Sequence, residues 1–164
     1  MFHRDGLPTM LIELTIPLVE ARANELLLRM PGELNIELVT QKATKKGTLS
    51  ETLDVAVTKL GRPIAYGMAS GAERFRIDLA LRLGLAGVLL HRTGAQFATL
   101  WLDEPFAAQD AEALEALLQS VAAVVDEFGF TFVTTHQREV ADRFPVRIEV
   151  SQGRSRQRKV RVAA

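Results

Sequence analysis

The stretch Ala98 to Asp110, ATLWLDEPFAAQD, decides the fold of this 164-residue chain. Together with Phe97 it begins as a short, continuous apolar run over residues 97–102, which is typical of a strand buried on both faces of a parallel sheet. Asp103 and Glu104 follow at once, so two carboxylates stand where the strand ends. We therefore predict a buried strand that carries acidic side chains at its carboxyl end, with Asp103 beginning the exit loop.

Helix-like and strand-like segments alternate on both sides of this stretch. The predicted helices cover residues 72–90, 111–128 and 137–143, and the other predicted strands cover residues 130–135 and 146–150. Such alternation favours an α/β fold in which a mainly parallel sheet is flanked by helices. Ligands bind at the carboxyl ends of parallel strands, which is where Asp103, Glu104 and His136 fall.

The first third of the chain has a different pattern. Residues 10–30 predict a helix that is kinked at Pro17 or begins near it, and Pro31-Gly32 stops that helix. Residues 34–39 and 53–57 alternate between apolar and polar side chains around Lys45-Lys46-Gly47, which predicts a β-hairpin.

Composition bounds the class of protein. A hydrophobic content of 48% is enough for the core of one domain, and 20 basic residues balance 20 acidic ones, so net charge indicates no partner. Cysteine is absent and three scattered histidines form no metal-ligand cluster, which argues against structural zinc. We find neither the apolar core of a signal peptide nor a membrane-length apolar run, so we expect a cytoplasmic location and no membrane partner.

Asp103 and Glu104 suit the chemistry of phosphate hydrolysis. At a strand end, the first carboxylate can hold hydrated magnesium and the second can poise a water molecule, contributing roughly 10²- to 10⁴-fold as a general base. The alternative is that Asp103-Glu104-Pro105 is merely a polar turn.

Two further motifs stand at a helix start and at a strand end, where their polar groups can bind a phosphate. Ser70-Gly71-Ala72-Glu73 begins a helix, so free amides and the helix dipole can bind an anion such as a nucleotide phosphate, or Ser70 and Glu73 can form only a capping box. His136 ends the strand FTFVTT, and a neutral imidazole there can donate a hydrogen bond to a terminal phosphate or be purely structural.

Taken together, SGAERFRIDLALRLGL, ATLWLDEPFAAQD and FTFVTTHQ resemble the C-terminal lobe of ABC-type ATPases of the SMC superfamily. The E-R-F-R-x-D-x-A-L-R run is most similar to the SbcC class of DNA double-strand-break repair ATPases. A coiled-coil end, a hairpin, the signature helix, Walker B, the D-loop and the switch histidine follow in the family's order.

This resemblance implies a role for particular residues. Glu104 and His136 would be catalytic, and Asp103 would serve Mg²⁺, through water. Four residues would bind ATP across a dimer interface: Ser70, Gly71, Ala72 at the second signature glycine, and Asp110 of the D-loop. Arg74 and Arg82 would relay the nucleotide state to the coiled coil; the alternative is a solvated ion-pair face with Asp78.

The chain departs from the family pattern in two ways. Ala69 and Ala72 replace the usual leucine and glycine of the signature, and a methyl group at residue 72 can crowd a phosphate or be harmless. No G-x-x-x-x-G-K-[ST] phosphate loop is present, so the amino-terminal lobe must be supplied separately and the chain alone should not hydrolyse ATP. We expect residues 1–9 to be a linker or vector remnant, residues 10–31 the coiled-coil end, and residues 32–164 the ATPase lobe.

The resemblance implies an ATPase that dimerises around ATP and Mg²⁺, binds DNA and controls DNA-end access for an SbcD-type nuclease. Two alternatives stay open: a nucleotide-gated DNA clamp without hydrolysis, and another SMC-superfamily head of the RecN or RecF type. Arg154, Arg156, Arg158, Lys159 and Arg161 can contact DNA phosphates or form a frayed, solvated tail.

Overall fold

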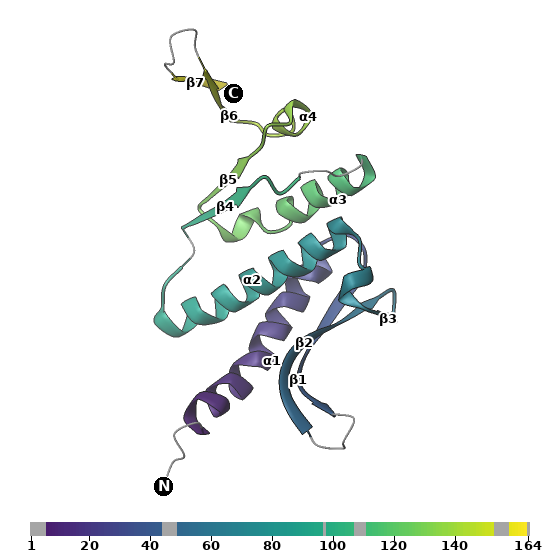
Figure 1. The fold of residues 1–164 in the computed structure, drawn as a ribbon. Coiled ribbons are helices and arrows are strands. Elements are labelled where there is room, and N and C mark those ends of the chain that lie inside the picture. The colour runs from purple at the N-terminus through teal and green to yellow at the C-terminus, as the bar shows by residue number, and fades with distance from the viewer. Residues whose placement is uncertain (1–5, 44–48, 97, 107–110, 153–157, 164) are drawn as a thin grey trace.

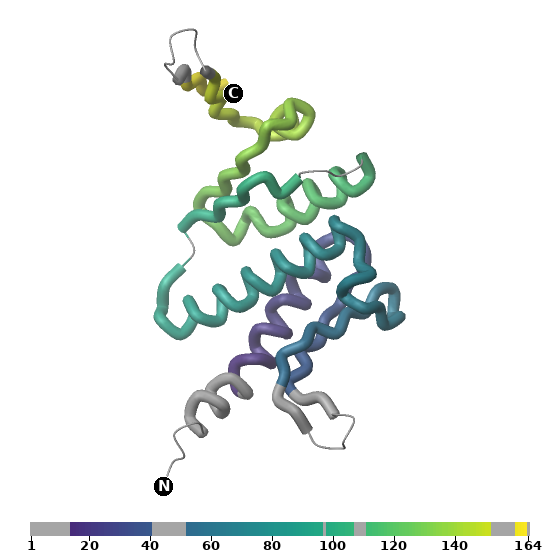
Figure 2. The backbone as a smooth tube through the Cα atoms, in the orientation of Figure 1, coloured from purple at the N-terminus to yellow at the C-terminus, as the bar shows by residue number. Residues whose placement is uncertain are grey.

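The computed structural model describes residues 6–43, 49–96, 98–106, 111–152 and 158–163. Helix α2 runs between the unit of α1 with its hairpin on one side and α3 with strands β4 and β5 on the other (Figures 1 and 2). The elements are α1 (Gly6–Arg29), β1 (Leu34–Ala43), β2 (Leu49–Lys59), β3 (Arg62–Ile64), η1 (Tyr66–Met68), α2 (Gly71–Thr93), β4 (Thr99–Asp103), α3 (Ala111–Ala122), η2 (Val125–Glu127), β5 (Phe130–Thr134), α4 (Arg138–Ala141), β6 (Arg147–Gln152) and β7 (Arg158–Ala163).

Helix α1 packs against α2 and the hairpin through its buried face. The backbones of the two helices come close at Gly84, where an added Cβ would lie 3.0 Å from the Val19 carbonyl oxygen. The side-chain amide of Asn24 fixes the hairpin, since it donates to the Ile36 carbonyl and accepts from the Ile36 amide, each at 2.8 Å. Leu26, Leu27, Ile36, Val57 and Ile77 are among the fully buried side chains of this core.

The predicted hairpin is confirmed and is longer than expected. Strands β1 and β2 pair antiparallel from Leu34↔Lys59 onward, and the short strand β3 pairs with the end of β2. The predicted turn at residues 45–47 lies outside the described residues.

Helix α1 differs from its prediction at the start. It begins at Gly6, within the segment predicted as a linker, and continues through Pro17. Proline lacks the amide N–H that would bond to the carbonyl of residue 13, and it is tolerated here in a helix whose other turns pack against α2 and β1.

Helix α2 confirms the predicted long helix. Ser70 and Glu73 form a capping box at its start, and Gly94 ends it in the left-handed conformation, with φ of 68°. Its inner face joins two buried clusters, one with α1 and the hairpin, and a second that contains Ala72, Phe106, Leu117, Val121 and Val140.

Strands β4 and β5 pair in parallel, as predicted, but they are not buried on both faces. One face packs inward through side chains such as Leu102 and Val133. The other leaves Trp101, Phe130 and Phe132 exposed by 64%, 68% and 40%. The apolar run was correctly predicted to form a strand. The prediction that this strand is buried on both faces is wrong, because the sheet has two strands here and nothing described covers its outer face.

The predicted third parallel strand is also different. Strand β6 does not join β4 and β5; it pairs antiparallel with β7, from Arg147↔Ala163 to Gln152↔Arg158. Residues 158–161 of the basic tail are therefore part of a strand. The reason is local, because Ile148 and Val150 of β6 alternate with polar residues and match Val162 and Val160 of β7 in register.

The remaining elements follow the prediction with shorter bounds. Helix α3 ends at Ala122, and a short 3₁₀ turn, η2, precedes β5. Helix α4 is reduced to a single turn. Within the described residues, no helix has both the length and the apolar character that crossing a membrane requires.

Candidate functional site

The predicted acidic pair and the histidine lie together. Strands β4 and β5 are parallel and in register at Asp103↔Thr134, so the residues that follow both strands emerge at the same edge. His136 Nδ1 lies 2.9 Å from Glu104 Oε1. The prediction that these side chains share one sheet edge is confirmed.

Glu104 is held in an unusual backbone conformation. Its φ is 46°, a left-handed value that costs a non-glycine residue about 1 kcal/mol or more. Its amide donates to the Thr134 carbonyl at 3.1 Å and lies 3.3 Å from the Thr134 hydroxyl oxygen. The turn thereby directs the carboxylate toward His136, and Glu104 Oε2 is buried without a hydrogen-bond partner in the described part of the chain.

Asp103 is held by the same threonine, whose hydroxyl donates to Asp103 Oδ1. Sequence reasoning missed Thr134. The sequence alone does not reveal this residue, because Thr134 lies opposite Asp103 only through the register of the two strands.

The chain beyond the acidic pair is fixed by a further contact. Gln137 Nε2 donates to the carbonyl of Phe106 at 3.2 Å, and the Phe106 side chain is fully buried beside the start of α2. Asp110, predicted for the D-loop, lies outside the described residues.

The start of α2 forms a separate cluster. Glu73 donates its amide to Ser70 Oγ at 3.2 Å, and its carboxylate accepts the Ser70 amide at 2.8 Å. Ser70 and Gly71 are exposed, whereas Ala72 is buried in the second core cluster. The Ala72 methyl therefore packs into protein, and what Ala72 offers an anion is its backbone amide.

The alternative for Arg74 and Arg82, an ion-pair face with Asp78, is not what the described structure shows. Asp78 accepts a hydrogen bond from the Tyr66 hydroxyl at 2.7 Å, and this bond raises the pKa of Tyr66. In the described part of the chain, Arg74 and Arg82 are exposed and form no ion pair with Asp78. They remain available as cations on this face.

Sequence reasoning also missed Arg76, which is only 5% exposed. Its Nε donates to the Ala72 carbonyl at 3.2 Å, and its Nη1 donates to the carbonyl of Pro31. Burial lowers the pKa of this guanidinium. Arg76 thus connects the start of α2 to the end of α1, and nothing in its local pattern distinguishes it from its exposed neighbour Arg74.

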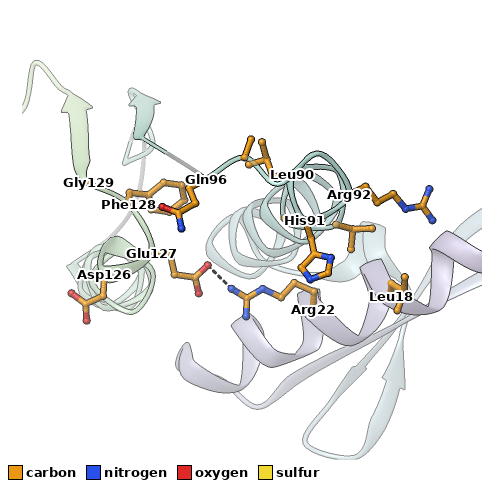
Figure 3. A pocket seen from close by; sticks show the side chains of 13 residues that line it. Leu18, Arg22, Leu90, His91, Arg92, Gln96, Asp126, Glu127, Phe128 and Gly129 are labelled. Carbon is orange, nitrogen blue, oxygen red and sulfur yellow. Dashed lines mark hydrogen bonds and ion pairs between the residues drawn. The ribbon is translucent and has the colours of Figure 1, made fainter.

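A cleft of about 1080 Å³ lies elsewhere, between α1, the end of α2 and η2. Figure 3 shows Glu127 facing Arg22 across it. The Glu127 carboxylate accepts from both Arg22 and Arg29 at 2.6 Å, and so ties α1 to η2. None of the predicted site residues lines this cleft, and we assign it no ligand.

The fold of the chain is similar to that of solved ATPase heads. It matches a solved structure from work on ATP-driven dimerization and DNA-stimulated activation of SMC ATPases, with a TM-score of 0.65 and 17% identity, over 94% of this chain and 88% of that one. It also matches an Smc head bound to the C-winged helix domain of ScpA, with a TM-score of 0.62 and 17% identity, over 93% of this chain and 44% of that one. The fold is therefore that of the SMC ATPase heads.

A comparison of sequences gives a more specific similarity. The SbcC component of the nuclease SbcCD from Staphylococcus aureus is 27% identical over 131 residues, which is 79% of this chain but 13% of that protein. No protein-family model matches the chain. The likeness in sequence and the likeness in fold together support a C-terminal ATPase lobe of the SbcC/SMC type, spanning a small part of the relative's length.

The capping box makes stability depend on pH. The hydrogen bond from Lys59, at 2.5 Å, and the Ser70 amide hold the pKa of Glu73 below its ordinary value of 4.5. A depressed pKa contributes stability that is present above the ordinary value and is lost as pH falls through the folded-state value.

We therefore expect Glu73→Gln, which keeps a capping side chain, to reduce the loss of stability between about pH 5 and pH 3. Urea unfolding at pH 7 and at acidic pH, for the wild type and the variant, measures this difference. Glu37→Gln, at an exposed position of β1, is the control. Equal pH dependence in the wild type and Glu73→Gln would show that Lys59 does not stabilise the Glu73 carboxylate.

Proposed function

We propose that this chain is the C-terminal half of an SbcC-like ATPase. Completed by an N-terminal lobe that carries the Walker A phosphate loop, and paired with a second copy, it would bind and hydrolyse ATP. The hydrolysis would control DNA-end processing by an SbcD-type nuclease in double-strand-break repair. The observation that carries this proposal is the contact between the Glu104 carboxylate and the His136 imidazole at the shared edge of β4 and β5.

Glu104 suits the role of general base. Its carboxylate can accept a proton from a water molecule that attacks the terminal phosphate, since the side chain is partly exposed at the strand edge beside His136. The left-handed turn fixes where that carboxylate lies, so little reorientation is needed before reaction.

The acidic edge also fits magnesium. Mg²⁺ in nucleotide sites is held by one or two carboxylates together with phosphates and water, and a set of three protein ligands is not required. In the described residues no three His, Cys, Asp or Glu side chains form a metal-binding group, whereas Asp103 is exposed with one oxygen bonded to Thr134. Asp103 would hold the ion, through water, and the ion when bound neutralises charge on the phosphates.

The His136 contact refines the predicted role of that residue. If Nδ1–H donates to an ionised Glu104, a neutral ring has no second N–H, and its Nε2 can only accept. Donation to a terminal phosphate therefore requires either the doubly protonated ring or release from Glu104. We propose that the His136 ring is released from Glu104 when the phosphate arrives.

Ser70 and Gly71 would act on the nucleotide of the second copy. Their exposure, at the start of a 23-residue helix, supports access of a phosphate to the Ser70 hydroxyl and to the backbone at Gly71. The Ala72 methyl is buried in the second core cluster, which supports a phosphate approaching this end of the helix without crowding by that methyl. Asp110 would contribute from the D-loop, and Arg74 and Arg82 would relay the nucleotide state.

The exposed apolar face of β4 and β5 supports the proposal that a second lobe packs on this sheet. Trp101 stacks on Phe132 with ring centroids 5.3 Å apart, and Phe130 extends this aromatic row on the solvent face. Both outer strand edges are unpaired in the described structure. An apolar face on an open two-stranded sheet needs a partner, and we propose that the N-terminal lobe covers it.

The exposed face of α1 supports a coiled coil. Five exposed positions are spaced alternately four and three residues apart, and four of them are apolar: Leu14, Leu18, Ala21, Glu25 and Leu28. This spacing is the heptad pattern of a helix that packs against another helix. We propose that α1 is the end of the returning coiled-coil helix. The roles in DNA binding and in nuclease control rest on the similarity to the SbcC component of SbcCD.

The lobe interface can be tested by substitution. In a complex of this chain with an N-terminal lobe, Trp101→Lys should weaken association roughly 30-fold, because central tryptophans contribute most to interfaces. Leu53→Lys is the control, since Leu53 is equally exposed but lies on the hairpin, away from β4 (Figure 1). Sedimentation equilibrium measures both. Equal loss in the two variants, or none in Trp101→Lys, would contradict the proposed lobe interface.

A further inference from the structure

We propose that Thr134 is the positioning residue of the site, and that one hydroxyl sets both Asp103 and Glu104. This inference rests on the proposed ATPase function and adds a residue to it. Thr134 would not touch the substrate; it would act through the two carboxylates.

The hydroxyl of Thr134 has a donor role and an acceptor role at once. It donates to Asp103 Oδ1 and accepts from the Glu104 amide, whose nitrogen lies 3.3 Å from the hydroxyl oxygen. The adjacent Thr134 carbonyl accepts the same amide at 3.1 Å. A single residue thus holds the side chain of one acidic residue and the backbone of the next.

This geometry follows from the sheet. Thr134 is the register partner of Asp103, on the face that also carries Trp101 and Phe132. The neighbours of Thr134 on this face are the apolar Trp101 and Phe132 and the site residue Asp103. A valine at residue 134 would therefore fit the strand equally well. A threonine there is explained by what its hydroxyl contacts.

The contact with the Thr134 hydroxyl matters because the turn at Glu104 is strained. A left-handed backbone at a non-glycine residue persists only where its surroundings hold it, and Glu104 has φ of 46°. Without the hydroxyl, the Glu104 amide keeps one acceptor and Asp103 loses its donor. We therefore expect the carboxylates to sample other positions, which weakens metal binding before it affects nucleotide binding.

The first test uses the chain alone. In Thr134→Val the Glu104 amide should exchange its proton about five- to tenfold faster, by NMR on the labelled chain, while the other amides of β4 and β5 keep their rates. Thr134→Ser, which retains the hydroxyl, should restore the wild-type rate. Thr135→Val is the matched control, since the Thr135 hydroxyl accepts from the Gln137 amide at 3.1 Å and contacts neither carboxylate.

The second test uses the complex with an N-terminal lobe. The dissociation constant of Mn²⁺ in the presence of ATP, followed by electron paramagnetic resonance, should rise about tenfold in Thr134→Val, with metal-free ATP affinity unchanged. Thr134→Ser and Thr135→Val should resemble the wild type.

The outcomes separate this inference from the proposed function. Wild-type exchange at Glu104 in Thr134→Val, or unchanged Mn²⁺ affinity in a complex that hydrolyses ATP, overturns the role of Thr134 and leaves the ATPase intact. A wild-type complex that never hydrolyses ATP counts against the function, while the exchange measurement still decides whether Thr134 holds the turn.

Discussion

Glu104→Gln should lower the turnover of the assembled ATPase by roughly 10²- to 10⁴-fold, the contribution typical of a positioned general base. Glutamine has the same shape, and its amide oxygen can still accept from His136 Nδ1, so the geometry of the edge is kept. The glutamine side chain cannot take a proton from water. ATP affinity should therefore stay near the wild-type value, and the variant should accumulate ATP-bound dimers.

The matched control for this variant is Glu37→Gln, an identical change at an exposed position of β1. Steady-state phosphate release and equilibrium ATP binding, measured on the same preparations, separate chemistry from binding. Normal turnover in Glu104→Gln would remove Glu104 from the catalytic role, whatever its contact with His136.

Ser70→Arg should abolish ATP-dependent dimerisation and lower turnover by at least about 100-fold. The arginine places a long side chain where we propose that the phosphate of the second copy approaches, and it removes the cap of α2. The lost cap alone should cost about 1 kcal/mol of stability, which is too little to account for such a loss of activity in a folded complex.

A second substitution separates capping from nucleotide contact. Aspartate caps helices as well as serine does, so Ser70→Asp should keep the stability of α2 while placing a negative charge against the phosphate. We expect Ser70→Asp to unfold like the wild type and to fail in dimerisation, as judged by light scattering with ATP and Mg²⁺. If Ser70→Asp dimerises normally, Ser70 is only a helix cap.

The sequence predicted the parts of the fold that local pattern determines. The long α2 helix, its capping box and the hairpin are confirmed, because periodicity and caps act over a few residues. The shared edge of Asp103, Glu104 and His136 is confirmed as well, since parallel strands bring their carboxyl ends together.

The errors arose where a partner strand decides the outcome. An apolar run predicts which residues seek burial, but it does not show whether a second layer covers Trp101, which is exposed in the described structure. The placement of β6 was wrong for a related reason, because its match with β7 in register was not weighed against the parallel sheet.

The missed site residues share a physical cause. Thr134 and Arg76 act through contacts made across the fold, to Asp103 and to Pro31, and sequence spacing does not reveal such contacts. Asp78 shows the same limit, since its spacing from Arg74 and Arg82 left an ion-pair face open as an alternative, whereas Tyr66 from another element holds it.

The most direct measurement is magnesium-dependent ATP hydrolysis by this chain in complex with a cognate N-terminal lobe. We predict that neither part alone releases phosphate, that the complex does, and that activity rises with the square of concentration where dimers are scarce. A complex that forms, binds ATP and dimerises without releasing phosphate would contradict the proposed ATPase and favour the nucleotide-gated clamp.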